Sequence, residues 1–267
     1  MTSKTTLPVL LLSTFILVLS ATLAAQDSEE ADFNLSIAAK YLNRFTSYGI
    51  DMAGESPAIR TSATLSHQSG LYTDVYYTMP TSSSIEKGEQ GTIDIGYETE
   101  FSETFSFYAE FAHYYYNNDT INVFSQYSNS LSLNASIDLE FMELGFSYDR
   151  FLGSNGASYF SFDISTFQEI GPVYLMPMLQ MVFMSQTVED RYLDKGKGNK
   201  GTGSEVIATT TLTGLSSTSL TLVVAYPVFS GLTISIVPSL IFYHQNELSV
   251  DSSRFLWNAG LRYSFDL

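Results

Sequence analysis

Carboxylates lie on one face of several short segments in which polar and apolar residues alternate, and they are the residues best placed to do chemistry in this chain. Residues 92–101 place Asp94 and Glu98 on one side and Ile93 and Ile95 on the other. A strand points alternate side chains to opposite faces, so such a segment has an acidic face and an apolar face. Carboxylates around a shared aqueous interior would attract cations and orient polar solutes. The next question is which kind of sheet could position them.

The last thirteen residues, 255–267, show the same alternation most completely. The odd-numbered side chains from Phe255 to Leu267 are all apolar and include Trp257 and Tyr263, whereas the even-numbered ones are mostly polar. Aromatic residues near both ends of an apolar face are typical of a strand that crosses two membrane interfaces. A soluble sandwich could also end on an amphipathic strand, so this segment alone leaves both architectures open.

Composition narrows the choice of partners and chemistry. The chain has 267 residues, no Cys and a net charge of -16. The lack of Cys excludes disulfides and thiol chemistry. The acidic balance disfavours nucleic acid and also a basic patch that docks on anionic lipid. The 18 Tyr and 19 Phe, with abundant Ser and Thr, favour β-structure.

The N-terminus reads as a secretory signal peptide. Lys4 precedes an apolar run from Leu7 to Leu19, and small residues follow through Ala24 and Ala25. The run is too short and wrongly flanked for a spanning helix, and a buried N-terminal helix is the alternative. We therefore expect a signal peptide over residues 1–25, cleaved after Ala24 or Ala25, and one domain over residues 26–267.

Alternation of apolar and polar residues predicts a series of strands. They cover residues 33–44, 58–66, 71–79, 92–101, 105–115, 129–138, 142–149, 157–167, 172–185, 220–228, 232–243 and 255–267. The connections between them alternate between short and long. The short ones are 67–70, 102–104, 139–141, 168–171 and 229–231, and the long ones are 45–57, 80–90, 116–128, 186–216 and 244–253. A soluble sandwich has no reason to sort its loops in this way, whereas outer-membrane barrels do.

The predicted fold is all-β: a transmembrane antiparallel up-and-down β-barrel of about 12 strands, with short periplasmic turns and long outer loops. A further candidate strand, residues 206–212, would make the count odd. Bacterial barrels of this kind have an even number of strands. We therefore interpret residues 206–212 as a strand extension above the membrane, inside the long outer loop.

Alternation also predicts which charged side chains line the lumen. A basic wall would combine Lys40, Arg44, Arg60 and Arg262, because the last strand closes against the first. An acidic wall would comprise Asp74, Asp94, Glu98, Glu100, Glu110, Asp138, Glu143, Asp149 and Asp163. Such a transverse field selects ions in a narrow pore, and the excess of acid predicts cation preference. Alternatively the groups pair and plug the lumen, because small barrels are filled by side chains.

Other polar groups give weaker signals. His67, His113 and His244 read as lone histidines, because an acyl-transfer site needs a Ser, a His and a third orienting group in contact. No two His have metal-ligand spacing. The Gly- and Lys-rich residues 196–203 lack the phosphate-loop pattern, and Asp190 and Asp194 show no calcium-loop pattern. We expect no catalytic residue, cofactor or metal.

Residues 35–77 resemble the opening of the TorF-type porins, a family of small outer-membrane barrels. The resemblance is carried by Tyr41, Arg44, Gly49, Pro57-Ala58, Arg60, Ser62 and His67-Gln-Ser-Gly70-Leu-Tyr72. Later positions fit the same rhythm: Ile93-Asp94, Gly96-Tyr97, Tyr148-Asp149 and Gly171-Pro172. Phe45 stands where the family pattern has Gly. The resemblance implies a porin-like role and supplies neither a substrate nor catalytic residues.

Three functions follow from these patterns. The first is an outer-membrane pore for passive diffusion of small polar or ionic solutes, with cation preference. The second is a plugged structural or adhesive barrel whose outer loops meet partners, and the weakest is a lipid enzyme with a site at the rim. The expected partners are outer-membrane lipid, small solutes and the barrel assembly machinery, which reads aromatic-ended last strands; here Leu267 replaces the usual terminal Phe.

Overall fold

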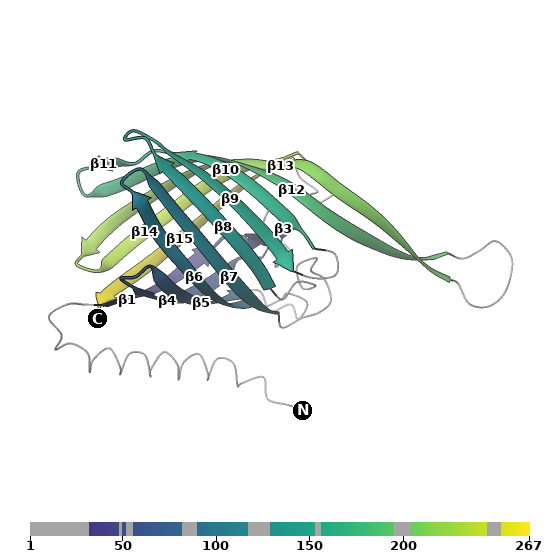
Figure 1. Cartoon of the computed structure of the whole chain (residues 1–267), viewed down its shortest axis with the longest axis horizontal. Coiled ribbons are helices and arrows are strands. Elements are labelled where there is room, and N and C mark those ends of the chain that lie inside the picture. The colour runs from purple at the N-terminus through teal and green to yellow at the C-terminus, as the bar shows by residue number, and fades with distance from the viewer. Residues whose placement is uncertain are drawn as a thin grey trace, which may run out of the picture.

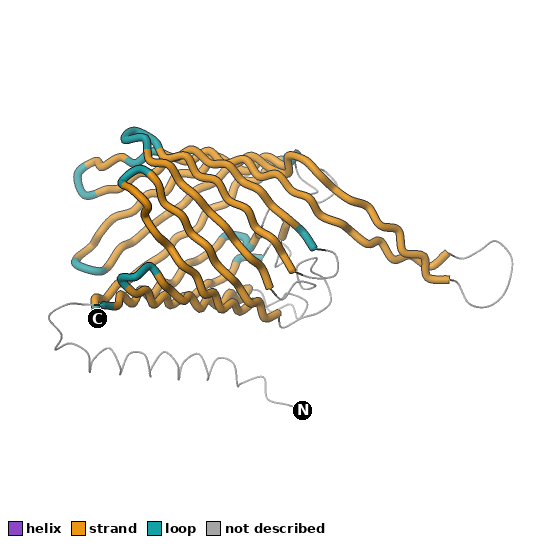
Figure 2. The backbone as a smooth tube through the Cα atoms, viewed as in Figure 1, coloured by secondary structure: helices purple, strands orange, loops and turns teal. Residues whose placement is uncertain are grey.

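A computed structural model describes residues 32–47, 50–51, 56–81, 90–116, 129–152, 156–194, 204–244 and 252–267. The described chain consists of strands joined by turns (Figures 1 and 2). The strands are β1 (Phe33–Leu42), β2 (Thr46–Ser47), β3 (Ile50–Asp51), β4 (Ala58–His67), β5 (Leu71–Pro80), β6 (Gln90–Ser102), β7 (Phe105–Tyr116), β8 (Asn129–Asp138), β9 (Glu143–Leu152), β10 (Ser158–Ser165), β11 (Gln168–Ile170), β12 (Val173–Asp194), β13 (Ser204–Phe229), β14 (Leu232–Tyr243) and β15 (Ser253–Asp266). In these ranges, no helix has the length and apolar character needed to cross a membrane.

Twelve of these strands form one closed antiparallel sheet. The order runs β10-β9-β8-β7-β6-β5-β4-β1-β15-β14-β13-β12, and β12 pairs back with β10 to complete the ring. β11 continues the line of β10 along the same edge of β12, because Ser165 pairs with Met178 and Gln168 with Leu175. The predicted fold class, an all-β antiparallel barrel of twelve strands, is therefore confirmed. The two-residue strands β2 and β3 form a separate hairpin between β1 and β4.

The ring closes where the first and last barrel strands meet. β1 pairs with β15 from Asn34 opposite Asp266 to Leu42 opposite Asn258. The seam is extended by the Leu267 N–H, which donates to the Phe33 carbonyl, and by the Asn43 N–H, which donates to the Trp257 carbonyl. A sheet closed in this way has no unpaired edge to expose to lipid. The prediction that the final strand closes against the first is confirmed.

The two ends of the barrel differ. The short turns after β4, β6, β8, β11 and β13 all lie at the end where β1 begins and β15 finishes (Figure 2). We call this the turn end and the opposite one the loop end. The expected long connections at the loop end fall largely outside the described residues, as do residues 1–31 and 195–203.

The two faces of the barrel wall have opposite character. Large apolar side chains are exposed on the outward face of every part of the ring, for example Ile59, Met79, Ile93, Ile95, Phe111, Leu131, Phe160, Phe183, Leu220 and Leu261. Their neighbours in sequence, at the other parity, point into the lumen. A continuous apolar exterior suits hydrocarbon, because no polar side chain has to be desolvated there.

β12 and β13 are much longer than the sequence suggested. Their pairing continues past the barrel from Gln186 opposite Leu212 to Asp194 opposite Ser204, and Figure 1 shows this ribbon projecting from the loop end. Residues 206–212 are indeed a strand extension. The prediction that residues 186–194 belong to a loop was wrong, because their alternation is weak and the paired ribbon is Thr-rich rather than amphipathic.

Most other strand bounds agree with prediction within two or three residues. One of these small differences matters: the first strand was expected to reach Arg44 but ends at Leu42. Arg44 therefore belongs to the segment that follows β1, and strand alternation does not place it on the lumen wall. The chain also breaks after β10: Thr166 lies between β10 and β11, and its N–H donates to the carbonyl of Pro177.

Gly70 in the turn between β4 and β5 is required by local geometry. It has φ +91°, and a Cβ there would overlap the carbonyl oxygen of Glu98. The N–H of Glu98 also donates to the carbonyl of Gly70 at 2.9 Å, so the two backbones lie close together. We expect Gly70→Ala to lower the free energy of unfolding by about 2–3 kcal/mol, measured by urea unfolding in lipid vesicles. Gly171→Ala is the matched control, because Gly171 also has positive φ but has open space around it. Equal losses in the two variants would contradict the steric argument.

Candidate functional site in the barrel lumen

Three basic side chains gather where the ring closes. Lys40 on β1 lies opposite Arg60 on β4 and opposite Gly260 on β15. A Cβ on Gly260 would come within 2.8 Å of Lys40 Cγ, so only glycine leaves room for the lysine stem to lie across the seam. Arg262 lies one register step away, opposite Ala38, and interacts electrostatically with Lys40, as Arg60 does. We call Lys40, Arg60 and Arg262 the basic group.

Three carboxylates gather on the neighbouring wall and form the acidic group. Asp74 on β5 lies directly opposite Asp94 on β6, and Glu110 on β7 is opposite Gly96, one inward position further along β6. Thr64 Oγ1 donates to Asp74 at 3.1 Å. Like charges on directly opposed strand positions repel one another. The arrangement is therefore held by the fold and not by attraction within the group.

Two tyrosines belong to the same wall. The Tyr72 hydroxyl donates to Glu110 Oε2 at 2.8 Å, and the Tyr108 hydroxyl donates to the same oxygen. The two rings stack, with centroids 5.6 Å apart. Tyr72 reaches across β6 to do so, and Gly96 permits this, because a Cβ at that position would overlap the Tyr72 hydroxyl.

Within the described residues, the basic and acidic groups are not joined by salt bridges. Lys40 and Arg262 interact with Asp74 only through the longer-range field. Asp94 is 5% exposed, and its Oδ1 has no hydrogen-bond partner. A buried carboxylate oxygen with no donor is costly. The alternative in which these groups pair and neutralise one another is not what the geometry shows.

The turn-end half of the lumen is hollow and acidic. One cavity of ≈ 590 Å³ is lined by Thr64, Ser66, Tyr72, Glu98, Glu100 and Tyr108, among others. A second of ≈ 460 Å³ shares Glu98 and Tyr108 and continues to Glu143 and Asp163. Asp138 lies opposite Glu143 at the turn end of β8 and β9. We call the two cavities together the turn-end hollow.

Asp149 lies nearer the loop end, opposite Ser132 and Tyr159. The nine predicted acidic residues thus share the inward parity but do not form one patch. Asp74, Asp94 and Glu110 cluster together, and Glu98, Glu100, Asp138, Glu143 and Asp163 lie towards the turn end.

The loop-end half contains an apolar cluster. Its buried members are Phe45, Ala58, Phe151, Ala157, Tyr159, Val182 and Met184, with Leu42 and Tyr114 packed against them. We call this set the loop-end cluster. Tyr159, Val182 and Met184 alternate with the outward residues Phe160 and Phe183, so the cluster lies on the lumen side.

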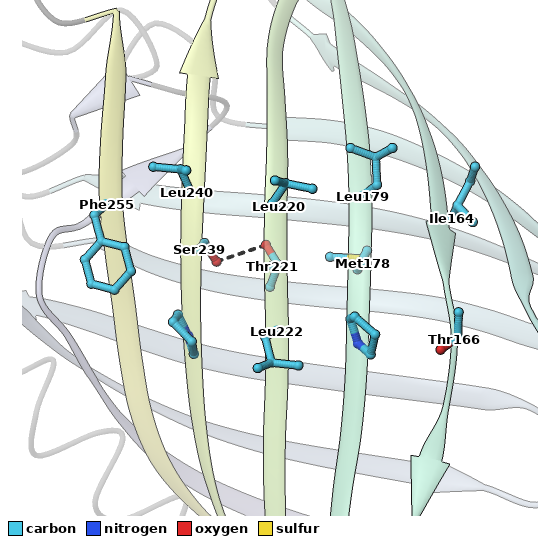
Figure 3. A pocket seen from close by; sticks show the side chains of 12 residues that line it. Ile164, Thr166, Met178, Leu179, Leu220, Thr221, Leu222, Ser239, Leu240 and Phe255 are labelled. Atoms are coloured by element: carbon cyan, nitrogen blue, oxygen red, sulfur yellow. Dashed lines mark hydrogen bonds between the residues drawn. The ribbon is translucent and has the colours of Figure 1, made fainter.

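A third hollow lies on the outward face and belongs to the lipid-facing surface. Figure 3 shows Leu179, Leu220, Leu222 and Leu240 side by side on β12, β13 and β14, with the Thr221–Ser239 hydrogen bond of 2.9 Å nearby. The groove measures ≈ 450 Å³ and is also lined by Pro177 and Pro238. It is strongly apolar, as expected for a surface in contact with acyl chains.

The histidines show local contacts. His67 Nδ1 lies 2.8 Å from Ser69 Oγ in an exposed turn, His113 Nδ1 2.8 Å from Asn129 Oδ1, and His244 Nε2 2.9 Å from Thr218 Oγ1. None of these three hydrogen-bond partners is a carboxylate that could orient the ring. In the described ranges, no three His, Asp or Glu side chains are grouped so as to hold a metal ion. The Gly- and Lys-rich residues 196–203 lie outside the described residues, and only the backbone of Asp190 and Asp194 is described.

Three contributors to the lumen were missed from the sequence. Tyr72 and Tyr108 were read only as inward residues, and their shared contact with Glu110 depends on a cross-strand register that alternation does not give. Phe45 was noted as a departure from a family pattern. That departure was the available signal for a special role.

The closed ring, the apolar exterior and the sorted turns define an outer-membrane-type β-barrel. The chain belongs to a family of bacterial proteins of unknown function, Gcw_chp, whose model matches residues 24–211. No curated protein matches it.

Solved barrels resemble it in structure. The chain is similar to the KdgM porin, with TM-score 0.53, 8% identity and coverage of 86% of this chain and 99% of that one. The NanC porin gives TM-score 0.49, 12% identity and coverage of 86% and 98%. LpxR from Salmonella typhimurium gives TM-score 0.45 and 7% identity, with coverage of 85% of this chain and 99% of that one. At these identities the likeness to the KdgM porin extends to the fold alone.

The crowding of the acidic group gives a stability prediction. Replacing Asp94 with Asn removes an ionisable carboxyl group from beside Asp74 and Glu110 and adds N–H groups that can donate to either carboxylate. We expect Asp94→Asn to raise the free energy of unfolding by about 1–2 kcal/mol, measured by urea unfolding in vesicles. Asp266→Asn, at an exposed position hydrogen-bonded to Asn34, should not raise it. A less stable Asp94→Asn barrel would contradict this reading of the acidic group.

Proposed function

We propose that the protein is an outer-membrane channel for passive diffusion of small polar or ionic solutes, with a preference for cations. The observation that carries the proposal is that the basic and acidic groups lie on adjoining parts of one closed lumen without salt bridges between them. A transverse field of this kind orients polar solutes and favours ions of one sign. Acidic lumen residues outnumber basic ones, which gives the sign of the preference.

The barrel fold supports placement in the outer membrane. The partners that follow are outer-membrane lipid around the apolar exterior and the barrel assembly machinery at the final strand. The similarity of residues 35–77 to TorF-type porins remains a prediction and points to the same role.

A plugged structural or adhesive barrel is the second candidate, and one specific observation favours it. The loop-end cluster places buried apolar side chains inside the lumen, where an open pore would have water. A plugged barrel would show no ion conductance, whereas a channel would.

Reversal potentials in planar bilayers under a salt gradient test the channel directly. We expect the wild-type barrel to favour K⁺ over Cl⁻. A triple variant, Asp74→Asn with Asp94→Asn and Glu110→Gln, should reduce the permeability ratio at least about threefold, because it removes the acidic group. Lys40→Gln with Arg262→Gln is the opposite-sign counterpart and should increase the ratio. Equal permeability in wild type, or no conductance in any variant, would contradict the proposal.

Export gives a separate prediction. We infer that residues 1–25 are a signal peptide and that residues 26–267 form the mature barrel. Mass spectrometry of protein purified from outer membranes should give an N-terminus at Ala25 or Gln26. A mature chain that retains Met1 would contradict this inference.

A further inference from the structure

The segment that follows β1 reaches the opposite side of the barrel. In the ring order, β1 and β4 are each five or six positions away from β9 and β10. Phe45 lies three residues beyond the end of β1, yet it is 2% exposed and belongs to the same buried cluster as Phe151 on β9 and Tyr159 on β10. Only a side chain inside the lumen can bridge walls that far apart in the ring.

Arg60 holds Phe45 in this position. Its guanidinium carbon lies 5.4 Å from the centroid of the Phe45 ring and 4.9 Å from that of Tyr76. The Nε of the same side chain donates to Thr78 Oγ1 at 2.9 Å. Arg60 is thus fixed to the wall at one side and covers the aromatic ring at the other. Cation–π contacts of this kind are strongest where water is excluded.

The far side of the ring is packed by aromatic residues. Phe151 contacts the Tyr159 ring edge-on at 5.8 Å between centroids and lies against Tyr114 at 5.9 Å. Every member of the loop-end cluster comes from the loop-end part of its strand or from a segment next to it. The apolar layer therefore sits between the charged groups and the loop end, while the turn-end hollow lies on the other side.

We propose that Phe45 forms the barrier that limits conduction through this barrel. The barrier is an apolar constriction at the loop end, and the charged lumen beneath it is a vestibule open to the turn end. Apolar constrictions stop hydrated ions by excluding water and not by repelling charge. This inference rests on the proposed channel and adds the residue that controls it. A solute crosses when the segment carrying Phe45 moves away from the opposite wall, and Arg60 opposes that movement.

Single-channel recording of Phe45→Ala tests the barrier. We expect conductance at least about twofold above wild type, because the side chain that bridges the two walls is removed. Phe160→Ala is the matched control: Phe160 adjoins Tyr159 in sequence but faces outward, so its removal should leave conductance unchanged. Heat-modifiable migration on gels confirms that each variant has folded.

Arg60→Gln provides a second variant that keeps Phe45 in place. It removes the cation above the ring, so the channel should spend at least about twice as long in its open state. Phe45→Leu, which keeps apolar bulk but lacks the aromatic ring, should keep the wild-type open-channel conductance and share the longer open time of Arg60→Gln.

The outcomes separate this inference from the proposed function. A wild-type barrel that conducts, with Phe45→Ala equal to it, overturns the barrier and leaves the channel standing. A silent wild type with a conducting Phe45→Ala supports the barrier and shows that the native barrel is closed. Silence in wild type, Phe45→Ala and Arg60→Gln alike overturns both.

Discussion

Every backbone N–H and C=O group that faces hydrocarbon must find a partner within the protein, and this constraint determines the rest of the structure. The chain meets it by closing β1 on β15 over the pairs from Asn34–Asp266 to Leu42–Asn258. Closure also creates the basic group, because Arg262 becomes a neighbour of Lys40 and Arg60 only across the seam. The residue that makes the seam tight enough, Gly260, lies directly against the Lys40 stem. The β1–β15 pairing thus both closes the sheet against lipid and brings the basic side chains together in the lumen.

The lumen combines features that do not favour stability. Asp74, Asp94 and Glu110 crowd together without basic partners in contact, and Lys40 faces two arginines. Groups of like charge are tolerated where water and mobile ions can solvate them, and they are retained where they serve a function. The turn-end hollow supplies space for such water beside Glu98, Glu100, Glu143 and Asp163. The loop-end cluster, in contrast, contains the apolar packing of an ordinary core, so one barrel has an aqueous half and a dry half.

Alternation along the strands was sufficient to predict the barrel and its twelve strands, whereas the two charged lumen walls remain a prediction. Alternation is informative because successive side chains of a strand point to opposite faces and because the outward face of every barrel strand contacts hydrocarbon, which selects apolar residues. It failed for residues 186–194, where the ribbon leaves the membrane and the hydrocarbon no longer selects apolar side chains. It also placed the end of the first strand two residues too late, at Arg44, since the chain leaves the wall after Leu42 and alternation carries no information beyond that point. The contact of Tyr72 and Tyr108 with one oxygen of Glu110 depends on register across three strands, which composition and periodicity do not specify.

A channel requires a barrel lumen that holds water and an outer face that contacts lipid. Cysteine labelling along β4 tests both properties at once. The chain has no Cys, so the reagent can label only the cysteine that each single substitution introduces. A charged, water-soluble thiol reagent applied to barrels in lipid vesicles should modify Ser62→Cys and Thr64→Cys, which face inward, and should leave Ala63→Cys and Leu65→Cys unmodified. Unreactive cysteines at 62 and 64, or reactive ones at 63 and 65, would contradict a water-filled lumen surrounded by a lipid-facing wall.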